Sequence, residues 1–211
     1  MSSSNTSRHP RRRTALLAGL SLLSGLGALA GCDAPVPTAA FKAVDISGAD
    51  YADQLELPDV DGKRRNLSEF KDKLAVVFFG YTQCPDVCPT TLNDLVETQR
   101  LLGPDGDKLV AILVTVDPER DTAALLKGYV GNFNPSWVAL RGSAEETAAA
   151  AKRFKVFYRK APGTSADTYT VDHTAASYVF DTQGRIRLYV RNGTPPADLA
   201  ADLKILLAQK G

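Results

Sequence analysis

The chain has 211 residues, of which 44% are hydrophobic and 23% charged, as expected of a globular protein with one domain and short extensions. Four of its 25 basic residues are arginines within residues 1–31, and the remaining 21 face 24 acidic residues, a net charge of −3. Because no basic stripe remains after residue 31, the composition argues against nucleic-acid binding.

The N-terminus has the pattern of an export signal. Four arginines between Arg8 and Arg13 precede an apolar run over residues 16–30, which is too short and too rich in Gly and Ser for a membrane span. The run ends in Leu29-Ala30-Gly31-Cys32, which resembles the lipobox of bacterial lipoproteins, whose cysteine is lipidated and becomes the first mature residue. We therefore expect a signal peptide over 1–31 and a lipid anchor on Cys32. An ordinary cleaved signal or an uncleaved anchor is the alternative. Each places the protein in the cell envelope, at a membrane and facing the periplasm or extracytoplasmic space.

Two further regions follow the signal. Residues 32–48 are rich in small residues and proline and are expected to form a flexible tether. Residues 49–211 are expected to form the folded domain. Near its start, apolar and polar residues alternate and Asp61-Gly62 is a strong turn signal, which predicts a β-hairpin.

A buried strand and a helix are predicted next. Residues 74–79 (LAVVFF) form a short β-branched and aromatic run, typical of a central strand. Residues 80–83 interrupt it, and Pro85 suits the first position of a helix that continues to about Leu102. Tyr81 and Trp137 are expected in the core.

The second half alternates strands and helices before an antiparallel pair. We expect a second buried strand over 108–116, a helix to about 130, a short strand over 137–140 and a helix opened by the Ser143/Glu146 capping box. A polar loop over 165–172, a hairpin of strands 177–181 and 186–190, and a closing helix complete the prediction. This order predicts an α/β fold of thioredoxin-like type: a mixed central sheet flanked by helices, with an N-terminal β-hairpin extension.

Cys84 and Cys88 lie where the first helix should begin. The unpaired N–H groups and dipole of a helix N-terminus favour the thiolate, which is both the nucleophile and the metal ligand. A spacing of four is a rise of about 6 Å along a helix, with both side chains on one face. That separation allows a disulfide and also lets two sulfurs converge on one ion. A redox pair and a metal site are both open, although the usual redox spacing has one residue fewer.

His173 is the only histidine that remains after export. We expect it in the loop before a central strand, opposite the helix that carries the cysteines. Two thiolates and an imidazole suit Cu(I) and, with some rearrangement, Cu(II). Zinc would require a fourth ligand, which Asp172 or Asp117 could supply. Asp117 is otherwise expected to steer a ligand or partner, and Asp121 to cap the following helix.

These residues fall in motifs that resemble the Sco/SenC family, thioredoxin-like copper chaperones for cytochrome c oxidase assembly. The matching segments are residues 80–89 (GYTQCPDVCP), 116–122 (VDPERDT), 171–174 (VDHT) and Phe180-Asp181 with Gly184. The resemblance implies that Cys84, Cys88 and His173 bind one copper ion. It also implies delivery to the binuclear copper site of the copper-bearing subunit of the oxidase, or reduction of the cysteines of that site.

Two other functions use the same cysteines. A membrane-tethered thiol–disulfide oxidoreductase would use Cys84 and Cys88 as a redox pair and keep the cysteines of the oxidase copper site reduced. A peroxidase would use one reactive cysteine and gain nothing from the second cysteine and the histidine. The sequence does not decide whether the protein is an enzyme; we expect a monomer that could receive copper from another periplasmic carrier.

Overall fold

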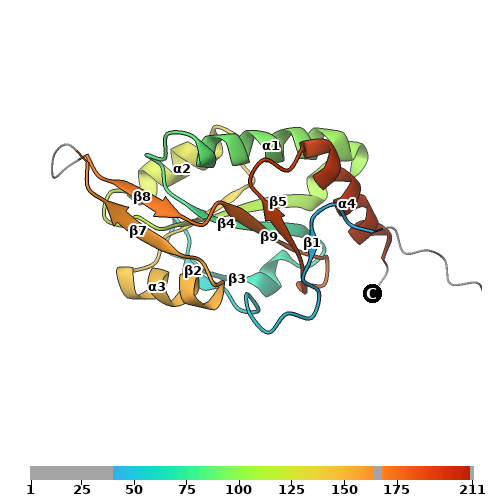
Figure 1. The fold of residues 1–211 in the computed structure, drawn as a ribbon, viewed down its shortest axis with the longest axis horizontal. Helices are drawn as coiled ribbons and strands as arrows, with labels where there is room; N and C mark the ends of the chain where they lie inside the picture. Colours follow the sequence, from blue (N-terminus) through green and yellow to red (C-terminus); the bar gives the residue numbers. More distant parts are fainter. Residues whose placement is uncertain (1–39, 164–167, 210–211) are drawn as a thin grey trace, which may run out of the picture. The chain divides into compact units, whose positions relative to one another are not determined.

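The computed structural model describes residues 40–163 and 168–209 (Figure 1). All described residues belong to one compact unit, Ala39–Gly211. The predicted signal peptide, the lipidation site Cys32 and the first part of the predicted tether lie outside the described residues. Within the described part, no helix combines the length and the hydrophobicity needed to cross a bilayer.

A six-stranded mixed sheet forms the centre of this unit. Its order is β1 (Val44–Asp45), β10 (Ile186–Arg191), β9 (Ala176–Phe180), β4 (Leu74–Gly80), β5 (Leu109–Thr115) and β6 (Val138–Leu140). The β4, β5 and β6 strands are parallel, whereas β9 pairs antiparallel with both β4 and β10, and β1 pairs antiparallel with β10. Every residue of β4 and β5 is buried, as their continuous apolar runs predicted.

Helices cover both faces of this sheet. In Figure 1, α1 and α4 lie together along one side of the sheet and α3 lies on the opposite side. The helices are α1 (Val87–Leu102), α2 (Ala123–Gly131), α3 (Ala144–Arg153) and α4 (Pro196–Ala208), with a 3-10 turn η2 (Gly103–Lys108) after α1. Phe154, directly after α3, is fully buried, and its ring centroid lies 5.2 Å from those of both Phe79 and Tyr178. The layered, mixed arrangement confirms the predicted fold class.

The N-terminal hairpin is present as predicted. Strands β2 (Glu56–Pro58) and β3 (Arg64–Asn66) pair around the Asp61-Gly62 turn, where Gly62 has a φ of 83°. The 3-10 turn η1 (Leu67–Phe70) then leads into β4.

The predicted hairpin of strands near 177–181 and 186–190 is present as β9 and β10, but a further hairpin was not predicted. Strands β7 (Tyr158–Ala161) and β8 (Thr170–His173) form a separate two-stranded sheet. The expectation of a polar loop through residue 172, with His173 in a loop, is therefore wrong. The strand was missed because its outward positions, Thr170 and Asp172, are exposed and polar, which hides the short inward-facing pattern.

The sheet also includes residues that we expected in the tether. Val44–Asp45 pairs with β10. Just before it, the backbone N–H groups of Lys42 and Ala43 each donate to the buried carboxylate of Asp202 on α4 at 2.8 Å. A strand of two residues is too short to show an apolar periodicity, and a carboxylate far along the chain leaves no local pattern. The sequence therefore offered no sign of this attachment.

Candidate metal centre

The two cysteines lie in the cysteine loop, which we define as residues 81–86, and in the first turn of α1. The helix begins at Val87, so the prediction that Pro85 occupies its first position is wrong. Asp86 takes the cap position, but its side chain makes no capping hydrogen bond. Instead, the backbone N–H of Cys88 donates to Cys84 Sγ at 3.4 Å. A sulfur thus satisfies one of the free N–H groups at the start of the helix.

His173, at the end of β8, completes the cluster. Its Nε2 lies 3.6 Å from Cys88 Sγ and 4.0 Å from Cys84 Sγ. One ligand atom from each of the three residues lies within 4.8 Å of the other two. The Nδ1 atom lies 3.2 Å from the carbonyl oxygen of Thr174. In the tautomer with its proton on Nδ1, that proton donates to the Thr174 oxygen and the Nε2 lone pair faces the sulfurs, as a metal ligand requires.

Close packing places the Cys88 sulfur. Cys88 is fully buried, whereas Cys84 and His173 are half-buried. A methyl group added at Gly80, the last residue of β4, would come within 2.6 Å of Cys88 Sγ. Gly80 is therefore required for the sulfur to sit against the end of the strand.

The two thiols divide one proton between them. A hydrogen bond from the Cys88 thiol is the main cause that lowers the pKa of Cys84 to about 3; His173 and nearby backbone N–H groups contribute to this lowering, and burial opposes it. The same hydrogen bond, together with burial, raises the pKa of Cys88. The reduced pair is therefore a half-buried thiolate that accepts from a buried thiol, which suits it for metal binding or disulfide exchange.

The two predicted supporting aspartates differ. Asp117 is buried and accepts from the Tyr169 hydroxyl at 2.8 Å and from Arg120, which also donates to Gln83 in the cysteine loop. Asp172 is exposed and pairs with Arg159 at 3.2 Å. Among the described residues, neither aspartate belongs to the group of converging ligand atoms. Asp117 is thus tied to the cysteine loop and Asp172 is not.

Asp121 has a different role from the one predicted. Thr122, not Asp121, caps α2 by accepting from the Leu125 N–H at 3.2 Å. The fully buried carboxylate of Asp121 accepts from the Thr82 backbone N–H and hydroxyl, and from the Thr115 hydroxyl at 2.6 Å. Burial raises the pKa of Asp121 despite these donors. The carboxylate therefore fixes the cysteine loop to the end of β5.

Tyr81 is buried, as predicted for a core residue, but it also supports the site. Its hydroxyl accepts from the Val171 N–H at 3.2 Å, and its ring stands at 85° to the His173 ring with centroids 5.9 Å apart. The only sequence signal for this second role was its position three residues before Cys84.

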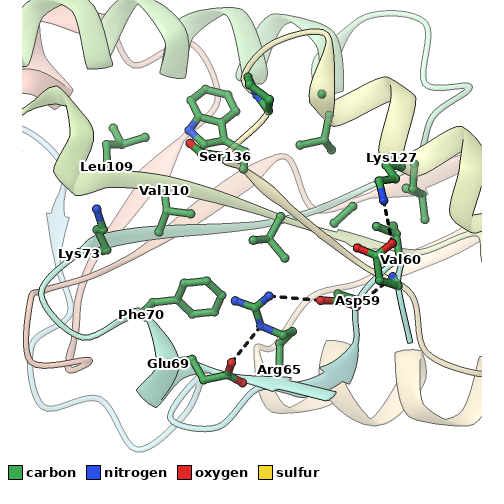
Figure 2. Close-up of a pocket in the computed structure, with 18 of the residues that line it drawn as sticks. Asp59, Val60, Arg65, Glu69, Phe70, Lys73, Leu109, Val110, Lys127 and Ser136 are labelled. Atoms are coloured by element: carbon green, nitrogen blue, oxygen red, sulfur yellow. Dashed lines mark hydrogen bonds and ion pairs between the residues drawn. The ribbon is translucent and has the colours of Figure 1, made fainter. Parts of the chain in front are cut away.

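A cavity of about 400 Å³ lies elsewhere, against β5, β6, α2 and η1 (Figure 2). Phe70, Leu109 and Val110 contribute apolar walls. Arg65 lies between Asp59 and Glu69, with nitrogen–oxygen distances of 3.2 and 3.1 Å. None of the three candidate metal ligands lines this cavity, so it is separate from the candidate metal centre.

Comparisons with known proteins agree with the geometry. An SCO2-like protein of Rickettsia felis is 33% identical over 151 residues, covering 71% of this chain and 74% of that protein. A structure of Bradyrhizobium japonicum ScoI with copper bound has 42% identity and a TM-score of 0.64, covering 72% of this chain and 96% of that one. Yeast Sco1 with copper bound has 26% identity and a TM-score of 0.67, covering 75% and 88%. The SCO1/SenC family model matches residues 44–208, which include the whole cysteine and histidine cluster. The chain therefore belongs to the SCO1/SenC family.

Proposed function

We propose that the protein is a copper metallochaperone that binds and carries one copper ion, with Cys84, Cys88 and His173 as its ligands. The ion is cargo, delivered to the copper-bearing subunit of cytochrome c oxidase during its assembly. The observation that carries the proposal is the convergence of two sulfurs and one imidazole nitrogen within 4.8 Å of one another. The copper-bound structures of Bradyrhizobium japonicum ScoI and yeast Sco1 support it.

The donor set suits copper. Two soft sulfurs and an imidazole favour Cu(I) and accept Cu(II) with some rearrangement. Cys84 is available as a thiolate, whereas Cys88 must release its proton to become a ligand. Copper binding should therefore release protons.

The location is part of the proposal. The Leu29-Ala30-Gly31-Cys32 sequence supports a lipid anchor on Cys32 after removal of residues 1–31. The protein would then act as a membrane-anchored monomer facing the periplasm or extracytoplasmic space, where the copper-bearing subunit of the oxidase and a copper donor could reach it.

Copper titration of the reduced chain without its signal peptide tests this function. We expect one ion per chain for Cu(I) and for Cu(II), with sulfur and nitrogen ligands in X-ray absorption spectra. Each of Cys84→Ser, Cys88→Ser and His173→Ala should weaken binding of Cu(II) by at least about 10-fold, because each removes a ligand. Asp172→Asn is the matched control and should bind as the natural chain does. Unchanged affinity and stoichiometry in all three ligand variants would refute the proposal.

A thiol–disulfide oxidoreductase is the second candidate, and the thiolate–thiol pair favours it. The Cys84 thiolate would attack a partner disulfide and release one partner thiolate. Cys88 would then attack the mixed disulfide, so that the partner leaves with two reduced sulfurs and Cys84 and Cys88 become oxidised. This reaction needs no metal ligand at His173. A His173→Ala variant that keeps full thiol exchange and full oxidase assembly would favour this function over copper delivery.

A further inference from the structure

The position of His173 depends on how the β7–β8 hairpin is attached. This hairpin is a separate two-stranded sheet, and Figure 1 shows it extending beyond the central sheet. Along β8 and the residue before it, exposure alternates: Tyr169, Val171 and His173 are buried or half-buried, while Thr170 and Asp172 are exposed. Side chains of a strand alternate between its two faces, so the first three share the inward face. Whatever holds Tyr169 therefore also orients His173.

Arg120 contacts this face through both hydrogen bonds and ring stacking. Its Nη1 donates to the Tyr169 carbonyl oxygen at 2.8 Å and to Gln83 Oε1 at 3.2 Å. Its guanidinium carbon lies 3.6 Å from the centroid of the Tyr169 ring. Its Nε donates to Asp117, whose other oxygen accepts from the Tyr169 hydroxyl. One guanidinium thus joins the hairpin, the cysteine loop and the segment after β5.

The other polar attachments of the hairpin are weaker, whereas Val171 is buried and packs in the hydrophobic core. Lys160 pairs with Glu119 at 2.6 Å, but their side chains are 48% and 67% exposed. Exposed ion pairs contribute little because solvent screens them. The hydrogen bond from the Val171 N–H to the Tyr81 hydroxyl is a single neutral contact. By contrast, the Arg120 side chain is 16% exposed and combines charge-assisted hydrogen bonds with stacking on an aromatic ring.

We propose that Arg120 is a positioning residue that fastens β8 to the cysteine loop and thereby holds His173 Nε2 beside the two sulfurs. Arg120 itself supplies no metal ligand. The effect on copper rests on the proposed function, whereas the attachment of the hairpin does not. Loss of Arg120 should leave the cysteine pair in place and let His173 move away from it.

Arg120→Gln removes the planar fork and its charge, and Arg120→Lys keeps the charge alone. Arg159→Gln is the matched control. It removes a guanidinium from the same hairpin, but one that points to solvent and pairs with the exposed Asp172. The first measurement is amide hydrogen exchange of Val171 and His173 in the reduced, metal-free chain. We expect exchange to be at least about 10-fold faster in Arg120→Gln, because the hairpin opens more often, and intermediate in Arg120→Lys. Arg159→Gln should match the natural chain.

The second measurement is Cu(II) binding, followed by the nitrogen hyperfine signal in electron paramagnetic resonance. We expect Arg120→Gln to lose the nitrogen signal and to bind Cu(II) roughly 10- to 100-fold more weakly, as when a residue that supports a metal ligand is removed. Tyr169→Phe keeps the stacking ring but loses the hydroxyl contact to Asp117, so its Cu(II) affinity should lie between those of the natural chain and Arg120→Gln. This milder variant keeps the proposal testable if Arg120→Gln fails to fold.

The outcomes separate the two proposals. Natural exchange rates and an intact nitrogen signal in Arg120→Gln would overturn the role of Arg120. Equal effects of Arg120→Gln and Arg159→Gln would also overturn it, because any change to the hairpin would then suffice. If the natural chain itself shows no copper ligation while Arg120→Gln still speeds exchange, the copper function fails and the attachment stands.

Discussion

At the scale of single residues, the candidate metal centre depends on Gly80, which has no side chain. Gly80 ends the buried strand β4, and Cys88 Sγ occupies the space that a Cβ at position 80 would need. The sulfur belongs to a helix whose position is fixed by its own packing, so it has little freedom to retreat.

Gly80→Ala should therefore weaken copper binding and destabilise the reduced chain by about 1–3 kcal/mol, through overpacking at Cys88. The destabilisation should be smaller when Gly80→Ala is combined with Cys88→Ala, which removes the clashing sulfur. Gly128→Ala on α2 is a control, because a methyl group there meets nothing within 4 Å. Urea unfolding of the single and double variants measures the coupling; strictly additive effects would contradict this account.

The charge on Cys84 gives a second prediction. Since its pKa is lowered from 9.0 to about 3 in the folded reduced chain, it should react as a thiolate throughout the neutral range. Iodoacetamide should modify Cys84 ahead of Cys88 at pH 5, at a rate nearly constant up to pH 8, as peptide mapping can show. A rate that rises about tenfold per pH unit up to pH 8 would indicate an ordinary thiol. Because the folded pKa is the lower one, the reduced chain should gain stability as the pH rises from about 3 toward 9.

The three candidate ligands could be predicted from the sequence because Cys84, Cys88 and His173 are the only free cysteines and histidine expected to remain after removal of residues 1–31 and lipidation of Cys32. The residues that position them could not. Arg120, Gln83 and Tyr169 meet through side chains separated by up to 86 positions, and no local pattern marks such contacts. For Asp172, adjacency in sequence was misleading, because neighbouring residues of a strand point to opposite faces.

At the scale of secondary-structure elements, continuous apolar runs predicted the central strands well. The β4 and β5 strands agree with the prediction to within one residue at each end. The β7–β8 hairpin was missed because it lies at the periphery, where β7 shows no alternation of buried and exposed residues and only one face of β8 is buried. The start of α1 was misplaced because a cysteine sulfur, rather than an Asp or Ser side chain, meets its free N–H groups.

The β9–β10 turn shows an element held by one carboxylate. Asp181 is buried and accepts hydrogen bonds from the backbone of Gln183 and Arg185 and from the side chains of Arg185 and Arg187. Burial alone would raise its pKa, but these donors lower it below its ordinary value. The turn is therefore stabilised by the ionised form of Asp181.

Asp181→Asn should cost about 1–3 kcal/mol of unfolding free energy at pH 7, because it weakens charge-assisted hydrogen bonds to a buried group. A lowered carboxyl pKa contributes stability above the ordinary value near 3.9, and that contribution is lost as the pH falls through the folded value. The difference between Asp181→Asn and the natural chain should thus shrink below about pH 4. Thermal unfolding of the two chains between pH 3 and 7 measures it; a constant difference would be inconsistent with this role.

At the scale of the whole molecule, the folded unit binds the segment 42–45 at the edge of its central sheet and against α4. Strand β1 covers the outer edge of β10, and Asp202 on α4 accepts from the N–H groups of Lys42 and Ala43. Asp202 is fully buried, and within the described residues its carboxylate accepts hydrogen bonds from these two N–H groups alone.

A chain that begins at residue 49, the domain start expected from the sequence, should be less stable than one that begins at residue 40. The shorter chain leaves a buried carboxylate without donors, which costs about 1–3 kcal/mol, and it exposes an edge strand. Urea unfolding of both chains tests the prediction. The reference variant is Asp202→Asn in the longer chain; equal midpoints for the two lengths would show that the attachment is dispensable.

Finally, the candidate ligands are far apart along the chain: His173 follows Cys88 by 85 positions and Cys84 by 89. An unfolded chain therefore offers copper two thiols at most in one place, and the full donor set exists only in the native state. Ligand binding confined to the native state raises stability with ligand concentration. Copper should thus raise the unfolding temperature of the natural chain more than that of His173→Ala, and a damaged chaperone would lose its cargo as it unfolds.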